Sequence, residues 1–81
     1  MRLDKFLKVS RVIKRRTVAN EACDAGHISV NGKIARASYD VSVGDVVTVA
    51  FGERRLTFRV LDVKESVGKD AAASLYEVIP E

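Results

Sequence analysis

Residues 2–16, RLDKFLKVSRVIKRR, decide how this chain folds and what it presents to solvent. The stretch holds seven Lys and Arg residues against a single acid, Asp4. At about 100° per residue, its apolar side chains gather on one side of a helix, and its first basic residues point to the other side. The apolar residues on that side are Leu3, Phe6 and Leu7. The pattern predicts a helix over about residues 3–9, buried on one face and cationic on the other.

The cations of this stretch recur at every third position and then run together at its end: Arg2, Lys5, Lys8, Arg11, Lys14, Arg15 and Arg16. A spacing of three drifts about 60° per step around a helix, so we expect the later cations on the helix end and the connection after it. A solvated helix face is the simplest alternative explanation. However, a merely soluble helix usually mixes Glu with Lys, and this run is almost single-signed.

Charge is also segregated along the 81 residues. Residues 1–36 have a net charge of +6, whereas residues 37–81 have a net charge of −3. A concentrated basic face is typical of proteins that bind polyanions. The length and the ordinary composition predict one domain over residues 1–81. We expect no membrane partner, because no apolar run reaches about 18 residues, and the single Cys favours a reducing, cytoplasmic setting.

A second helix is expected from an N-cap at Thr17 to about Ala25, with Glu21 near its positive end and Gly26 in the left-handed position after it. Its apolar face is expected to consist of Val18, Ala19, Ala22, Cys23 and Ala25.

Strands are predicted for the remainder of the chain. Asn31-Gly32, between residues 27–30 and 33–35, is a strong hairpin signal. A two-residue turn would place Lys33 on the face of Val30, so either the turn is longer or the second arm is irregular. Residues 37–42 are interpreted as a loop or short edge segment, and residues 71–74 as a helical turn or a linker. Further strands are expected at 46–50, 54–63 and 75–79. The predicted fold class is α+β, with two N-terminal helices packed on a small antiparallel sheet of four to five strands.

Several of these segments together resemble a known family. They are RLDKFL, the basic linker, Thr17-Val-Ala, Gly26-His-Ile-Ser-Val-Asn-Gly and Val43-Gly44-Asp45. Their combination, RLD…G-x-I-x-V-N-G…V-x-x-G-D, is similar to the RNA-binding domain first known from small-subunit ribosomal protein S-four. The resemblance covers about residues 1–50, with additional strands in 51–79. The run MRLDKFLKVSRVIKRRT is most similar to a family of short ribosome-associated quality-control factors, the RqcP family.

The resemblance implies a non-catalytic factor without a cofactor that binds the stalled large ribosomal subunit. The implied partners are large-subunit ribosomal RNA, tRNA or peptidyl-tRNA, and a nascent-chain tailing factor on the same particle, and the implied state is a monomer. One alternative is a heat-shock-type subunit-recycling factor, whose basic C-terminal extension contrasts with the acidic half here. Others are the accessory domain of an RNA-modifying enzyme, and a protein-binding module whose acidic C-terminal sheet is the working surface.

The family's RNA face lies on the two helices and their linker. Carried over to this chain, it consists of Arg2, Lys5, Lys8, Arg11, Lys14, Arg15 and Arg16, with Thr17 and Asn20 as polar neighbours. Asn31 and Lys33 at the hairpin tip and Arg36 beside it are further candidate RNA contacts. Arg and Lys suit phosphate because they keep their charge, and Arg adds a two-pronged donor. Asp4 is interpreted as an ion-pair partner that orients Lys8 or Arg16.

No set of residues typical of catalysis or metal binding is present. The sequence has no Ser/His/Asp set, no paired carboxylates and no phosphate-cradling Gly loop. His27 has no partner at metal-ligand spacing, and Cys23 is interpreted as a small buried apolar group. The aromatic residues do not cluster as a platform on which bases could stack: Phe6, Tyr39, Phe51, Phe58 and Tyr76.

Overall fold

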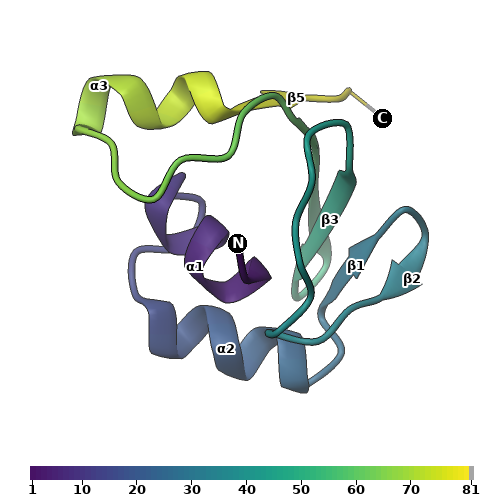
Figure 1. The fold of residues 1–81 in the computed structure, drawn as a ribbon. Helices are drawn as coiled ribbons and strands as arrows, with labels where there is room; N and C mark the ends of the chain where they lie inside the picture. The colour runs from purple at the N-terminus through teal and green to yellow at the C-terminus, as the bar shows by residue number, and fades with distance from the viewer. Residues whose placement is uncertain (81) are drawn as a thin grey trace.

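A computed structural model describes residues 1–80. The elements in chain order are α1 (Leu3–Val9), α2 (Arg16–Asp24), β1 (Ile28–Val30), β2 (Lys33–Ile34), β3 (Val46–Phe51), β4 (Arg54–Val60), α3 (Lys69–Ala72), the 3-10 turn η1 (Ala73–Leu75) and β5 (Tyr76–Val78). The strands form one antiparallel sheet in the order β2-β1-β3-β4-β5. Helices α1 and α2 lie on one side of the sheet and α3 lies near one end of it (Figure 1). The predicted α+β class is confirmed.

Strand ends differ from the predictions by a few residues. The strand expected over 54–63 ends at Val60, because the backbone N–H groups of Leu61 and Asp62 donate to the carbonyl of Leu75 instead of continuing the ladder. Residues 71–74, for which the sequence allows a helical turn or a linker, are helical and belong to α3 and η1. The chain therefore turns back through a helical segment before β5 pairs with β4.

Helix α1 begins where a distant segment of the chain accepts its first N–H groups. The N–H of Leu3 donates to the carbonyl of Tyr39 at 2.8 Å, and the N–H of Asp4 donates to that of Ala37 at 3.2 Å. These backbone acceptors take the place of a side-chain cap, which α1 lacks. An isolated bridge between Arg2 and Asp40 continues the contact, so residues 37–42 include the short edge segment that the sequence suggested.

The predicted N-cap of α2 is wrong. The helix begins at Arg16, one residue before Thr17, and the extended Arg15 precedes it without a side-chain cap. Its first turn contains no acid, so Glu21 lies too far along the helix to serve the N-terminus. The position at which α2 begins follows from contacts with another helix. Arg16 and Asn20 are one turn apart on the face toward α1, and both contact the carboxylate of Asp4.

The apolar face of α2 is narrower than predicted. Ala19 and Cys23 are buried, and Ala22 packs against the core. Val18, however, is 48% exposed, and Ala25 is exposed as well. Residues spaced three and four apart face α1, and the wider arc in the prediction included residues on the flanks of this stripe. Gly26 has a φ of +82°, so the predicted left-handed residue after the helix is confirmed.

The β1–β2 hairpin has a two-residue turn. Val30 pairs with Lys33, and both Asn31 (φ 52°) and Gly32 (φ 85°) are left-handed, as the tight hairpin turn requires. Of the two alternatives, the longer turn is therefore wrong. The second arm is short, and Ile34 is 73% exposed.

The core lies between the two N-terminal helices and the sheet. Phe6 of α1 stacks on Phe58 of β4 with ring centroids 6.3 Å apart, and Phe58 meets Tyr76 of β5 at 5.1 Å. Phe6 and Phe58 are fully buried. Three of the five aromatic residues therefore pack together, and the contact between Phe6 and Phe58 holds α1 on the sheet.

Candidate nucleic-acid interface

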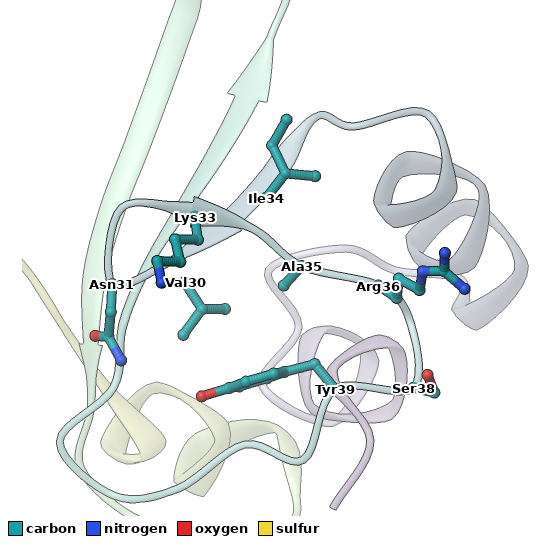
Figure 2. Close-up of a pocket in the computed structure, with 8 residues that line it drawn as sticks. All are labelled: Val30, Asn31, Lys33, Ile34, Ala35, Arg36, Ser38 and Tyr39. Carbon is teal, nitrogen blue, oxygen red and sulfur yellow. The ribbon is translucent and has the colours of Figure 1, made fainter.

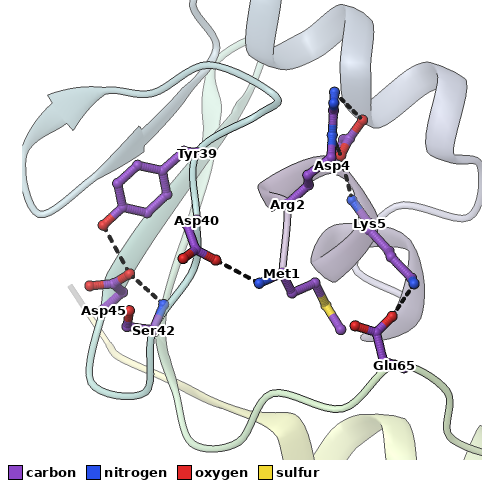
Figure 3. Close-up of polar contacts among 9 residues, drawn as sticks. All are labelled: Met1, Arg2, Asp4, Lys5, Tyr39, Asp40, Ser42, Asp45 and Glu65. Carbon is purple, nitrogen blue, oxygen red and sulfur yellow. Dashed lines mark hydrogen bonds and ion pairs between the residues drawn. The ribbon is translucent and has the colours of Figure 1, made fainter.

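The centre of the candidate interface is the junction between α1 and α2, where Asp4 is buried among basic and polar groups. Its side chain is only 3% exposed. Arg2 donates to both carboxylate oxygens at 3.2 and 3.4 Å, Asn20 donates to Oδ2 at 3.1 Å, and the N–H of Lys5 donates to Oδ1 at 2.8 Å. The Nε of Arg16 lies 3.5 Å from Oδ2. Figure 3 shows the contacts to Arg2 and Lys5.

These contacts test the interpretation of Asp4 as an orienting ion-pair partner. Its pairing with Arg16 is confirmed, and its pairing with Lys8 is wrong, because Asp4 turns inward to α2 whereas Lys8 is exposed. Sequence reasoning missed Arg2 and Asn20 as partners of this carboxylate. An acid in a run of cations was the only signal, and it does not indicate which cations lie nearby in the fold.

Each of the two arginines at this junction contacts Asp4 and also remains partly exposed to solvent. The side chains of Arg2 and Arg16 are 50% and 47% exposed. A guanidinium has five N–H donors in a planar fork, and the contacts with Asp4 use only some of them. The remaining donors are available to an incoming phosphate. A hollow of about 340 Å³ lies beside Arg16, and its other lining residues are Asp4, Thr17, Asn20 and Glu21.

The charge of Asp4 is stable at neutral pH. Burial raises the pKa of this carboxyl, but hydrogen bonds from Asn20, Arg2 and the Lys5 amide, together with the positive charge of Arg16, outweigh burial and hold the pKa below its ordinary value. An ionised carboxylate at the junction keeps both guanidinium groups oriented.

Four other cations of the stripe direct their side chains to places outside this junction. Lys5 forms an ion pair with Glu65, which lies 60 residues further along the chain (Figure 3). Three others line a separate hollow of about 510 Å³ at the end of α1: Lys8, Arg11 and Lys14. Arg15, the N-cap of α2, is exposed. The stripe that is continuous in sequence is therefore divided between two places on the surface.

The candidate residues of the hairpin border a third hollow, of about 640 Å³ (Figure 2). Lys33 and Arg36 stand on opposite sides of it, and Tyr39 forms one wall. Asn31 is engaged within the fold, since its amide nitrogen donates to Asp45 at 3.1 Å and its amide oxygen accepts the N–H of Val46 at 2.9 Å. This hollow is larger than that at the Asp4 junction.

Asp45 joins the β1–β2 hairpin to the loop that follows it. Its carboxylate also accepts hydrogen bonds from the hydroxyl of Tyr39 at 3.0 Å and from the N–H of Ser42 at 2.9 Å, and the bond from the hydroxyl raises the pKa of Tyr39.

Cys23 is buried as expected, and burial raises the pKa of its thiol to about 11, which keeps it protonated and unreactive. Within residues 1–80, no three His, Cys, Asp or Glu side chains gather as metal ligands.

No helix among the described residues is long and apolar enough to cross a lipid bilayer.

Two residues outside the predicted site lie beside its cations. Glu65 lies next to Lys5, and Lys69 lines the same hollow as Lys8. Both come from the acidic half of the chain, and no local pattern connects them with the basic stripe.

Comparison with known proteins gives sequence matches along the whole chain. Residues 1–47 match the S4 domain family. The chain is 54% identical over all 81 residues to a Streptococcus pneumoniae protein named RQC P-site tRNA stabilizing factor and covers 92% of that protein. A Bacillus subtilis protein of the same name is 53% identical over 81 residues, with 94% of its length covered.

Two solved structures are similar in fold. The trimeric structure of Vibrio cholerae Heat Shock Protein 15 matches with a TM-score of 0.90 and 29% identity, over 98% of this chain and 81% of that one. The solution structure of the hypothetical protein HP1423 matches with a TM-score of 0.84 and 26% identity, over 100% of this chain and 99% of the other.

Proposed function

The chain belongs to the S4 domain family, and we propose that it acts as a non-catalytic RNA-binding factor of ribosome-associated quality control. The predicted resemblances, to the S-four-type domain and to the short quality-control factors, are confirmed by the matches along the chain. The structural observation that carries the proposal is the pair of half-exposed guanidinium groups, Arg2 and Arg16, held on one buried carboxylate.

The proposed particle is a stalled large ribosomal subunit that still carries peptidyl-tRNA. The relatives' name supports a tRNA in the P site as one partner. The resemblance to the quality-control factors further supports large-subunit ribosomal RNA as a second partner, and a nascent-chain tailing factor on the same particle as a third. We propose that residues 1–81 act as one unit, as a monomer in the cytoplasm, and that the unit supports tailing of the stalled chain.

The geometry of the α1–α2 junction suits phosphate recognition. Because Asp4 already restrains the guanidinium groups of Arg2 and Arg16, they lose less conformational entropy when a phosphate arrives than free side chains would. Thr17 and Asn20 lie beside them and offer a hydroxyl and an amide to ribose 2′-hydroxyl groups. A rigid helical surface with these groups recognises RNA by shape and backbone.

A heat-shock-type recycling factor is the second candidate function. The close likeness to Heat Shock Protein 15 in fold favours it. Net charge argues against it, because residues 37–81 of this chain have a net charge of −3, whereas the resemblance implies a basic C-terminal part for such a factor.

The proposal is tested by sedimentation of the tagged chain from cell extract through a sucrose gradient. We expect it with large subunits that carry tRNA, and we expect ribonuclease treatment to release it. Sedimentation with small subunits, or a ribonuclease-resistant complex with protein alone, would contradict the proposal.

A further inference from the structure

The hollow at the end of α1 brings together residues from both halves of the chain. It has a volume of about 510 Å³ and lies between the α1–α2 connection and the segment that leads into α3. In Figure 1 this segment passes next to the end of α1. The lining residues are Lys8, Val9, Arg11, Lys14, Glu65, Ser66, Val67 and Lys69. The two valines pack against the core, so the hollow rests on the folded body and not on a loose tail.

The charge of this hollow is strongly positive. Four of its eight lining residues are cations and one is an acid. Lys69 is the informative member, because it comes from the half of the chain whose net charge is −3. The fold therefore adds a cation to the stripe at a place that the sequence pattern does not predict. Ser66 supplies a neutral hydroxyl beside these charges.

The backbone of Arg11 is unusual at this place. Its φ is +63°, in the left-handed region that non-glycine residues rarely adopt. It is the first residue after the C-cap of α1, a position at which glycine is usual. The N–H of Arg11 donates to the carbonyl of Lys8 at 3.1 Å, and that of Ile13 donates to Leu7 at 3.1 Å. An arginine thus stands at a position where glycine would fit without strain, and strained residues cluster at functional sites.

Glu65 provides an anion at the edge of this hollow. Its carboxylate forms an ion pair with Lys5, and its side chain also lines the hollow together with the four cations there. Its side chain is 75% exposed, so an incoming anion can displace it at little cost. Lys5 holds the pKa of Glu65 below its ordinary value, so this carboxylate is charged at neutral pH. Glu65 therefore places a negative charge at the edge of the hollow, where it opposes the binding of a phosphate.

We propose that this hollow is a second phosphate-binding site, separate from the Asp4 junction, in which Lys69 and Ser66 join the cations of the α1–α2 connection to bind an RNA backbone phosphate in competition with Glu65. RNA is favoured over an acidic protein because two cations of the hollow, Arg11 and Lys14, belong to the connection that leads along the chain to Arg16. The choice of RNA rests on the proposed function. The site itself rests on the geometry of the hollow.

The first experiment measures binding of a fluorescein-labelled tRNA by three variants over a range of salt concentrations. Lys69→Ala removes a cation from the hollow. Arg11→Gly removes a cation and also relieves the left-handed strain, so loss of binding without loss of stability separates the two roles. At about 0.1 M salt each of these two variants should bind about five- to eightfold more weakly, and its salt slope should be shallower by about 0.7–0.9. Lys64→Ala is the matched control, because Lys64 pairs with Asp62 outside the hollow and should change little.

The third variant, Glu65→Gln, tests the competition. Removal of the carboxylate should strengthen tRNA binding by at least about twofold. Glu53→Gln is its control, on the exposed β3–β4 turn. Binding by Glu65→Gln that is unchanged or weaker would overturn the role of Glu65. Losses in Lys69→Ala and Arg11→Gly no larger than in Lys64→Ala would overturn the site.

A second measurement keeps this inference distinct from the proposed function. Backbone NMR spectra of the whole chain are recorded with a short single-stranded RNA, with inorganic pyrophosphate and with a poly-glutamate peptide. We expect the RNA and pyrophosphate to shift the amide signals of Ser66 and Lys69, and Lys69→Ala to abolish the shifts. If these shifts are observed but the chain does not sediment with large subunits, the proposed function is wrong and the phosphate-binding site still stands. Stronger shifts from poly-glutamate would overturn RNA as its ligand, and no shifts from RNA or pyrophosphate would overturn the site.

Discussion

Arg16, the first residue of α2, reaches the buried carboxylate of Asp4 on α1, with its Nε 3.5 Å from Oδ2. This ion pair joins the two helices, and it also orients a guanidinium that remains 47% exposed. The packing of the helix junction and the proposed RNA site therefore share one residue. Every test of the site must consequently measure folding as well as binding.

The first prediction concerns acid unfolding. Because the pKa of Asp4 in the folded chain lies below its ordinary value of 3.8, its ionised form stabilises the fold fully above the pKa of the unfolded chain. That contribution is lost as the pH falls through the folded pKa. We expect Asp4→Asn to be less stable by about 1–3 kcal/mol at neutral pH, because its amide cannot satisfy the same donors. Urea unfolding at several pH values measures both effects.

Asp70→Asn is the control for this experiment, because Asp70 is an exposed acid on α3. Its stability should follow that of the wild type across the pH range. Asp4→Asn should lose less stability on acidification than either of them, and parallel curves for all three proteins would contradict the role given to Asp4.

A second prediction tests the narrow apolar face of α2. Ala19 is fully buried, so Ala19→Leu should overpack the contact with α1 and lower the free energy of unfolding by about 1–3 kcal/mol. Val18→Leu is the matched control at a site that is 48% exposed, and its effect should stay within about 0.5 kcal/mol. Thermal unfolding of both variants measures these effects. Equal melting temperatures would show that the buried face of α2 is assigned wrongly.

A third prediction separates a structural role of Asn31 from an RNA contact. Its amide links Asp45 to the N–H of Val46, and its backbone is left-handed. Asn31→Ala should therefore cost about 1–3 kcal/mol of stability. Lys33→Ala, at an exposed position in the same hairpin, should leave stability unchanged. Unaltered unfolding of Asn31→Ala in denaturant would mean that the amide is free to serve RNA.

Much of the fold follows from local sequence patterns. The helix over residues 3–9 is predicted because Leu3, Phe6 and Leu7 recur at helical spacing, and all three are buried. The hairpin is predicted because Asn31-Gly32 suits left-handed backbone on both residues. In these places the local preference and the tertiary structure agree.

The features that the sequence did not predict depend on distant contacts. Helix α2 begins at Arg16 and not after Thr17 because the carboxylate of Asp4, on another helix, binds Arg16 and Asn20. The division of the basic stripe has a similar cause, since Glu65 and Lys69 meet it only in the folded chain. Pattern analysis describes one element at a time, so it identified the cations but not the groups among which they lie.

The most direct test of the central claim compares two arginines of equal charge. Arg16 lies at the helix junction, whereas Arg59 lies on β4 with a side chain that is 50% exposed. The Nη1 of Arg59 is 3.8 Å from Oε2 of Glu77. Each is replaced by alanine, folding is verified by circular dichroism, and co-sedimentation with tRNA-bearing large subunits is measured at one salt concentration. We predict that Arg16→Ala weakens association about five- to eightfold or more, as loss of an ordered phosphate contact requires, and that Arg59→Ala changes it less than about twofold. Equal losses in the two variants would contradict a defined RNA site at the junction of α1 and α2.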